Sequence, residues 1–224
     1  MVADPTQVNQ LLAQTYPHAR CELTFEDPFQ LLVATVLSAQ STDSRVNSVT
    51  PVLFQQYPDP ASLAGAEQSA VEEIIRPTGL FRNKATALIG LSLALMRDHG
   101  GQVPAVLPEL VKLPGVGRKT ANVVLGNAFG VPGITPDTHV IRLANRFGWV
   151  DSKRPNDVEK SVAELFPAQE WVMVCHRIIW HGRRCCFARN PACGACVLAD
   201  ICPSFGAGET DPAAAAELVR KQSP

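Results

Sequence analysis

The sequence lacks the features that mark secreted, membrane-spanning and disordered proteins. No apolar run reaches the roughly 20 residues that a helix needs to cross a bilayer. The first ten residues contain neither a basic segment nor an apolar one, so a secretory signal is not expected. Charged residues make up 18% of the chain and hydrophobic residues 46%, which excludes a disordered chain and suits one large domain or two small ones. We therefore expect a cytoplasmic protein with no contact to a membrane.

The chain also lacks an excess of positive charge. Its formal net charge is −1, so composition alone does not indicate a nucleic-acid-binding protein. The distribution is uneven, because the segment 171–199 contains no acidic residue but four arginines: Arg177, Arg183, Arg184 and Arg189. This segment predicts one basic face on an otherwise neutral protein, and a solvated surface with chance clustering is the alternative.

Signals for β-strands are sparse, and no Asn-Gly hairpin turn separates alternating segments. Signals for helices are dense. Asp27 and Pro28 read as an N-cap and first helical residue, and the apolar run that follows predicts a buried helix through Gln40. The longest amphipathic stretch, 82–99, stops at Gly100 and Gly101. The fold class is therefore predicted to be all-α.

Further helices are expected along the second half of the chain. Their predicted ranges are 120–129, 137–147 and 170–180, and Asn156 with Asp157 is expected to cap another, which gives about ten short helices in all. The segment 130–136 is the richest in glycine and proline, so it is predicted to cross between two helical lobes.

A glycine-containing string, Leu-Pro-Gly-Val-Gly-Arg-Lys-Thr-Ala-Asn, occupies residues 113–122 between two helical stretches. Two glycines in this spacing allow a tight turn that presents backbone N–H groups outward, and a helix is expected to begin near Arg118. Such donors can approach a phosphate closely without reading the base sequence. The whole string resembles the helix–hairpin–helix element of DNA repair proteins, whereas an ordinary turn between helices is the alternative for the two glycines alone.

Cysteine is concentrated near the C-terminus. Five of the seven cysteines fall within residues 185–202, whereas Cys21 and Cys175 stand alone. Clustered thiols in a cytoplasmic chain usually hold a metal. A set of four suits Zn²⁺ or an iron–sulfur cluster, and the candidate set is Cys186, Cys193, Cys196 and Cys202. Its spacing of x6, x2 and x5 contains only one close pair. Cys185 gives a spacing of x7 if it serves as the first ligand instead. The neighbouring arginines are expected to offset the thiolate charge.

With both motifs present, the chain resembles the endonuclease III family of bifunctional DNA glycosylases and abasic-site lyases, from about residue 21 to residue 202. Further strings that carry the resemblance are 37–43, 78–84 and 137–140. The resemblance implies a six-helix barrel domain over 21–132 that contains the hairpin. It also implies an iron–sulfur domain made of 1–20 plus 133–224, a [4Fe–4S] cluster, and a substrate cleft between the two lobes.

The resemblance places the catalytic lysine at Lys119 and the catalytic aspartate at Asp137. An amine attacks a sugar carbon only when it is partly deprotonated, and a carboxylate can accept a proton or stabilise positive charge on the sugar. The implied reaction flips an oxidised pyrimidine out of duplex DNA, displaces it with Lys119 and cuts the strand by β-elimination. The alternatives are a phosphate contact or a surface position for Lys119 and a helix N-cap for Asp137.

The resemblance also implies DNA contacts. Gln40 is expected to fill the gap that the flipped nucleotide leaves, and Leu80 to wedge into the opposite strand. Arg82 and Lys84 beside this wedge fit either phosphate contacts or solvent. The remaining contacts are expected at the hairpin and the start of the helix that follows the crossing: Gly115, Val116, Gly117, Arg118, Thr120 and His139. The partner is then double-stranded DNA with an oxidised pyrimidine or an abasic site, bound by a monomer that associates with the nucleoid.

Three other readings compete with this one. An adenine-mismatch glycosylase typically has serine where Lys119 stands, needs a glutamate in its early helix, and carries a further domain. This chain has the lysine and no glutamate in 37–40, which argues against that reading. A thymine-mismatch glycosylase of the same superfamily differs mainly in pocket residues. A non-catalytic DNA-binding module would use the hairpin for grip alone, without the lysine chemistry.

Overall fold

The structure is a computed structural model that describes residues 2–220, and the outermost ends of the second predicted domain lie outside that range. Within it the chain forms twelve α-helices and four short 3₁₀ helices, with no strand, so the all-α prediction is confirmed. None of these helices is both long enough and apolar enough to cross a membrane. The residues fall into two compact units: Cys21–Val131, and the residues up to Arg20 joined to those from Pro132 onward.

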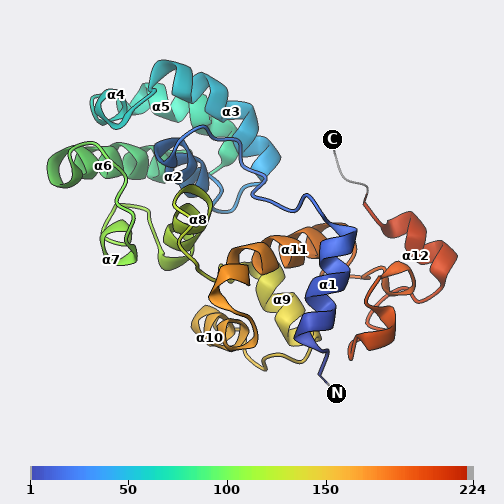
Figure 1. Ribbon diagram of the computed structural model, residues 1–224. Helices are drawn as coiled ribbons and strands as arrows, with labels where there is room; N and C mark the ends of the chain where they lie inside the picture. Colours follow the sequence, from blue (N-terminus) through green and yellow to red (C-terminus); the bar gives the residue numbers. More distant parts are fainter. Residues whose placement is uncertain (1, 221–224) are drawn as a thin grey trace. The chain divides into compact units, whose positions relative to one another are not determined.

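The first of these, the barrel unit, is Cys21–Val131. Its elements are α2 (Pro28–Leu37), α3 (Asp43–Gln56), α4 (Pro60–Ala64), α5 (Gln68–Ile75), η1 (Arg76–Thr78), α6 (Phe81–His99), α7 (Leu107–Leu110) and α8 (Arg118–Ala128). Figure 1 shows α2 among α3, α6 and α8, and each of these three helices packs against it. Eight of the ten residues of α2 are buried, which explains why its apolar residues run nearly all round.

The start of α2 follows the sequence prediction, but its end does not. The Asp27 side chain accepts a hydrogen bond from Gln30 N, and Pro28 is the first helical residue. The helix ends at Leu37 rather than Gln40, since Ser38–Gln40 form a tight turn in which Gln40 has a φ of 54°. The left-handed backbone at Gln40 cannot continue a right-handed helix. Helix α6 matches its predicted range to within one residue.

The second, the terminal unit, joins the N-terminal helix to the C-terminal half. Its elements are α1 (Pro5–Thr15), α9 (Thr138–Arg146), α10 (Pro155–Leu165), η2 (Ala168–Glu170), α11 (Trp171–Arg184), η3 (Cys193–Ala195), η4 (Ala199–Ile201) and α12 (Pro212–Leu218). Figure 1 shows α1 beside α11 despite their distance in sequence, and α9 packs on both α10 and α11. A single apolar core includes residues of all four helices.

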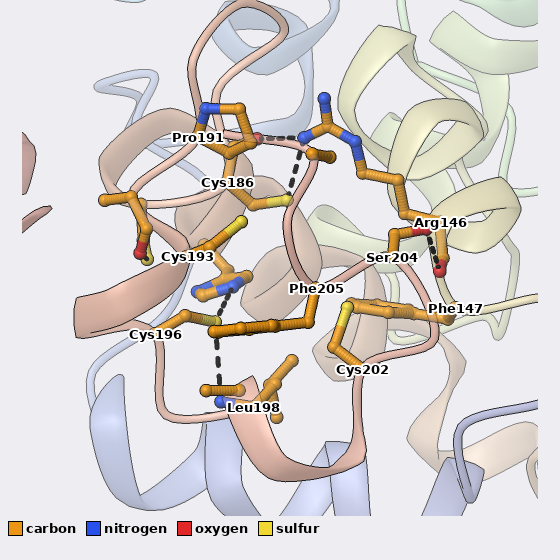
Figure 2. Close-up of a pocket in the computed structure, with 15 residues that line it drawn as sticks. Arg146, Phe147, Cys186, Pro191, Cys193, Cys196, Leu198, Cys202, Ser204 and Phe205 are labelled. Atoms are coloured by element: carbon orange, nitrogen blue, oxygen red, sulfur yellow. Dashed lines mark hydrogen bonds between the residues drawn. The ribbon is translucent and has the colours of Figure 1, made fainter. Parts of the chain in front are cut away.

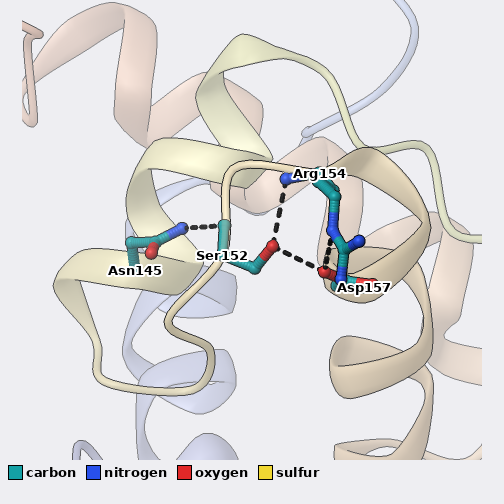
Figure 3. A network of polar contacts seen from close by, with 4 residues as sticks. All are labelled: Asn145, Ser152, Arg154 and Asp157. Carbon is teal, nitrogen blue, oxygen red and sulfur yellow. Dashed lines mark hydrogen bonds and ion pairs between the residues drawn. The ribbon is translucent and has the colours of Figure 1, made fainter.

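The predicted cap of α10 is wrong. The helix starts at Pro155 with Arg154 as N-cap, so Asn156 and Asp157 lie inside its first turn. Asp157 instead accepts hydrogen bonds from Ser152 Oγ (2.6 Å) and Arg154 Nε (2.7 Å), and it closes the loop before the helix (Figure 3). Proline is preferred at the first helical position, and an acidic residue in the first turn matches the helix dipole.

Candidate functional site

The predicted glycine hairpin forms in the barrel unit between α7 and α8. Gly115 has a φ of 76°, a left-handed conformation that favours glycine. Gly117 is the N-cap of α8 and, being glycine, has no side chain to cap this helix end. A Cβ added to Gly117 would meet nothing within 4 Å, so the surrounding space is open. The first-turn N–H groups of α8 are therefore placed to bind an anion, as the sequence predicted.

Side chains of the hairpin divide into exposed and buried ones. Val116 is only 6% exposed and belongs to the apolar core of the barrel unit, so it offers only its backbone to a ligand. Arg118 and Lys119 are exposed in the first turn of α8, and Thr120 is half-buried. The surroundings of Lys119 are therefore those of an exposed helix N-terminus and not those of a buried pocket.

We expect the substitution Gly115→Ala to weaken DNA binding and to destabilise the protein. Alanine at this φ costs roughly 1–2 kcal/mol, and its Cβ would lie 2.9 Å from Ala87 Cβ, so the turn must shift. Affinity for a DNA duplex, measured by fluorescence anisotropy, should fall. Gly100→Ala is the matched control, because Gly100 has a φ of 59°, open space around it and no place in the hairpin. Equal affinity in both variants would contradict a backbone grip by the hairpin.

The two residues that are expected to enter DNA share an unusual backbone. Gln40 has a φ of 54° and Leu80 a φ of 49°, and the only other non-glycine residue with positive φ in residues 2–220 is Asn190. Strained conformations of this kind persist where the surroundings hold them and gather at functional sites. Gln40 is exposed, and the apolar side chain of Leu80 is 53% exposed. Both side chains are therefore held outward on tight turns.

Lys84 holds both turns from inside the barrel unit. Its Nζ donates hydrogen bonds to the carbonyl oxygens of Leu37 (2.8 Å) and Thr78 (2.9 Å), which lie shortly before Gln40 and Leu80. Lys84 is 5% exposed, and burial lowers its pKa. The expectation of a phosphate contact or solvent position for Lys84 is therefore wrong. Its ammonium group instead donates to buried carbonyl groups at the ends of α2 and η1.

We expect Lys84→Met to lower both stability and the affinity for damaged DNA. The change leaves two buried carbonyl groups without their donor, and each such group costs about 1–3 kcal/mol. Chemical denaturation measures the first effect and anisotropy on a lesion duplex the second. Lys112→Met is the control, since Lys112 is exposed and pairs only with Glu109 within a surface turn. Unchanged affinity in a folded Lys84→Met protein would show that Lys84 does not position the turns.

Asp137 lies in the terminal unit as the N-cap of α9. Its Oδ1 accepts hydrogen bonds from the backbone nitrogens of His139 and Val140, both at 2.8 Å. The capping role, one of the two readings of Asp137, is thus present. The side chain is only partly buried.

His139 packs against α11 rather than standing free. Its Nδ1 lies 3.1 Å from Arg142 Nη2, and because arginine can only donate, the ring nitrogen accepts. A Cβ on Gly182 would lie 2.7 Å from the same nitrogen, so glycine is needed there for the ring to fit. Burial lowers the pKa of His139. The part of His139 in binding DNA stays a prediction.

A pocket in the terminal unit brings the clustered cysteines together. After α11, the loop from Cys186 to Cys202 carries η3 and η4 and returns to α9. Figure 2 shows the four cysteines around one space, and all four are among the residues that line it: Cys186, Cys193, Cys196 and Cys202. Segments that are up to sixteen positions apart thus present sulfur atoms to a common centre.

Two arginines of α9 support this loop, and the sequence analysis did not identify them. Arg146 Nη1 donates to Cys186 Sγ (3.0 Å) and to the Phe187 carbonyl (2.7 Å). Arg142 Nη2 donates to the carbonyl oxygens of Gly182 (3.0 Å) and Cys186 (2.9 Å). Arg142 and Arg146 are four residues apart on one helix face, a spacing visible in the sequence, but nothing local links it to the cysteines.

The predicted basic face over 171–199 is only partly present. Arg184 is 9% exposed and lies over the Trp180 ring at 4.1 Å. Arg177 is mostly buried and donates to Asn9 Oδ1 (2.6 Å). These two side chains serve packing within the unit, and it is Arg146, outside that segment, that reaches a cysteine sulfur.

The donor set of the pocket fits an iron–sulfur cluster. Four sulfur ligands face one space, and N–H groups reach two of them: Arg146 Nη1 at Cys186 and the Leu198 amide at Cys196 (3.4 Å). Hydrogen bonds to ligand sulfur are a standard feature of such centres. The isolated Cys175 is different, because it is buried away from the pocket and burial raises its pKa to about 11.

Two family models match the chain. The model of the HhH-GPD superfamily of base excision DNA repair proteins matches residues 33–168, which includes the hairpin, Lys119 and Asp137. The model of the iron–sulfur binding domain of endonuclease III matches residues 186–202, from the first to the fourth cysteine of the predicted set.

Curated relatives and solved structures agree with these models. Endonuclease III of Synechocystis sp. is 48% identical over 89% of this chain and 91% of its own length. Endonuclease III of Escherichia coli is 42% identical over 85% and 90%. A trapped covalent intermediate of endonuclease III with DNA superposes with a TM-score of 0.87 at 42% identity, over 92% of this chain and 98% of that one. A thermostable thymine-DNA glycosylase, at 21% identity and a TM-score of 0.80, shares the fold.

Proposed function

Since the chain belongs to the endonuclease III family within the HhH-GPD superfamily, and is therefore a base excision repair DNA glycosylase with an abasic-site lyase activity, we propose that Lys119 and Asp137 carry its chemistry. The observation that carries the proposal is the setting of Lys119. It is exposed in the first turn of α8, directly after the glycine hairpin, where the N-cap Gly117 has no side chain and the space beside it is open. A DNA phosphate bound to these groups would bring the sugar of the same nucleotide within reach of the amine.

Lys119 is assigned the role of the nucleophile in the covalent steps. The deprotonated amine attacks C1′ of the damaged nucleotide, forming an N–C bond as the glycosidic bond breaks, and the electron pair leaves with the base. Ring opening gives a Schiff base between Lys119 and C1′. Loss of a proton from C2′ then expels the 3′ phosphate and cuts the strand. Water finally releases Lys119 by hydrolysis of the Schiff base.

Asp137 is assigned the role of a proton acceptor and a stabiliser of positive charge on the sugar. One of its oxygens is used by the N-cap hydrogen bonds of α9, which fixes the carboxylate in orientation. Such a fixed carboxylate costs no reorganisation when charge develops on the substrate.

In this proposal the hairpin binds DNA phosphates, and two side chains enter the duplex. The hairpin residues Gly115, Val116 and Gly117 with Arg118 and Thr120 offer phosphate contacts. Gln40 occupies the space left by the flipped nucleotide, and Leu80 enters the opposite strand. Their exposed side chains and left-handed backbones support this assignment. An apolar wedge between base steps keeps a duplex kinked while one nucleotide is outside the stack.

The chain carries a [4Fe–4S] cluster. We assign its ligands to Cys186, Cys193, Cys196 and Cys202, with Arg146 offsetting thiolate charge at Cys186. When bound, the cluster joins four points of the loop to one centre. We further assign residues 21–132 to the barrel domain and 1–20 plus 133–224 to the cluster domain. A monomeric state and a place on the nucleoid in the cytoplasm stay predictions.

A duplex with one thymine glycol tests the proposal. The oligonucleotide is labelled at its 5′ end, and the undamaged duplex is the control. We expect strand cleavage without alkali, with a product that ends in the unsaturated sugar fragment left by β-elimination. Base release that gives cleavage only after alkali would contradict the lyase assignment, and no release of thymine glycol or any other oxidised pyrimidine would contradict the substrate class.

A further inference from the structure

The pocket that holds the cluster has a fifth sulfur. Cys185 lines it together with the four assigned ligands and is 4% exposed. Cys185 Sγ, Cys196 Sγ and a ring nitrogen of His181 all lie within 4.8 Å of one another. Cys185 Sγ therefore lies beside Cys196 Sγ, whereas its sequence neighbour Cys186 accepts a hydrogen bond from Arg146.

We propose that Cys185 is a reserve ligand of the cluster, placed to bind the iron that Cys196 holds when the bond from Cys196 is broken. This inference rests on the proposed ligand set. The exchange forms one iron–sulfur bond as another breaks. The Cys185 thiol gives its proton to water or buffer, and the thiolate of Cys196 takes one up. No oxidant or reductant is needed.

The ring of His181 lies near the sulfur atoms of both Cys196 and Cys185. His181 Nε2 lies 3.4 Å from Cys196 Sγ, and the Tyr16 hydroxyl lies 3.1 Å from Nδ1 of the same ring. His181 is 1% exposed and Tyr16 6%, so the ring is held in place by packing as well as by this contact. A ring nitrogen fixed beside both sulfurs can donate a hydrogen bond to whichever one binds iron.

The thiol of Cys185 makes a weak contact within a fixed backbone. Its sulfur makes a long contact of 3.7 Å to the Ala192 carbonyl, and weak S–H bonds of this kind are readily exchanged. Its backbone is fixed, since the amides of Cys185 and Cys186 both donate to the His181 carbonyl at 2.9 Å. The backbone of Cys185 is thus fixed next to the ligand loop, while its sulfur is held by a weak hydrogen bond.

The test measures iron per chain and visible absorbance of purified holoprotein variants. Cys193→Ala should lose the cluster, because the reserve sulfur stands beside Cys196. Cys196→Ala should retain it, and the double variant C185A/C196A should lose it. Loss in Cys196→Ala as complete as in Cys193→Ala overturns the proposal. Equal retention in Cys196→Ala and the double variant also overturns it, because His181 or another group would then be the substitute.

A second measurement keeps all four assigned ligands. In Cys185→Ala, which should bind about four iron atoms per chain, loss of the cluster to an iron chelator should be roughly 10-fold faster than in the wild type. Equal rates overturn the reserve role even if the Cys196→Ala protein fails to fold. A different result separates the two proposals: full clusters in both Cys193→Ala and Cys202→Ala would refute the ligand set itself.

Discussion

Replacing Lys119 with alanine is expected to lower lyase activity on an abasic-site duplex by at least about 10³-fold, because it removes the nucleophile of the reaction. Borohydride reduces a Schiff base to a stable amine, so the wild-type protein should form a covalent adduct with abasic DNA and the variant should not. Stability should change little, since Lys119 is exposed and lies in the first turn of α8.

Two further variants separate the role of Lys119 as a nucleophile from the effect of its positive charge. Lys119→Arg keeps a positive charge for phosphate, but arginine is not deprotonated in proteins and forms no Schiff base. It should therefore bind DNA and trap nothing. Lys112→Ala removes an exposed lysine on the other side of the hairpin and should trap normally. Trapping by Lys119→Arg at the wild-type level would show that another amine reacts, and Lys119 would then be only a phosphate contact.

The second large effect is expected at Asp137, where two roles coincide. Asp137→Asn should lower glycosylase activity by about 10²–10⁴-fold, the usual contribution of a positioned acid or base. Asparagine caps helices about as well as aspartate, so α9 keeps its N-cap and stability should stay nearly constant. Asp137→Ala loses the cap as well and should unfold about 1 kcal/mol more easily.

Asp4→Asn is the matched control for Asp137→Asn. Asp4 caps α1 in the same unit by accepting from Gln7 N at 2.7 Å, and no chemistry is assigned to it. Its activity should equal that of the wild type. Release of the damaged base by Asp137→Asn at the wild-type rate would reduce Asp137 to a helix cap. Activity is measured by single-turnover release of base from a thymine glycol duplex.

Local signals in the sequence predicted the helices that begin and end by short-range rules. Asp27 and Pro28 start α2, and Gly100 ends α6 with a φ of 59°. The hairpin was predicted for the same reason, because the backbone that Gly115 requires is available mainly to glycine. In each case one residue and its immediate neighbours determine the conformation.

Features that depend on distant residues were missed. Lysine is by type a surface residue, yet the position of Lys84 follows from two carbonyl groups at the ends of other elements. Arg146 contacts Cys186 forty residues away in sequence. His181 precedes Cys185 by four positions, one helical turn, and this spacing could have placed the two side chains near each other. The contact of His181 with Tyr16 joins residues 165 positions apart and has no local signal. The predicted cap of α10 was wrong because Asp157 accepts hydrogen bonds from Ser152 and Arg154 in the loop before the helix.

The site itself was predicted in its parts. The spacing of the cysteines and the hairpin string identified residues that the structure places in a common pocket and on an open helix end. Lys119 belongs to the barrel unit and Asp137 to the terminal unit. The joint chemistry that we propose for them rests on the family to which the chain belongs and on the residue types.

The central claim is that Lys119 becomes bonded to the sugar of the damaged nucleotide. Its most direct test is to reduce the wild-type reaction mixture with borohydride, digest the trapped complex with protease and nuclease, and locate the modified residue by tandem mass spectrometry. We predict a single sugar-derived mass addition on Lys119. Modification of the N-terminal amine or of another lysine, with Lys119 unmodified, would contradict the mechanism.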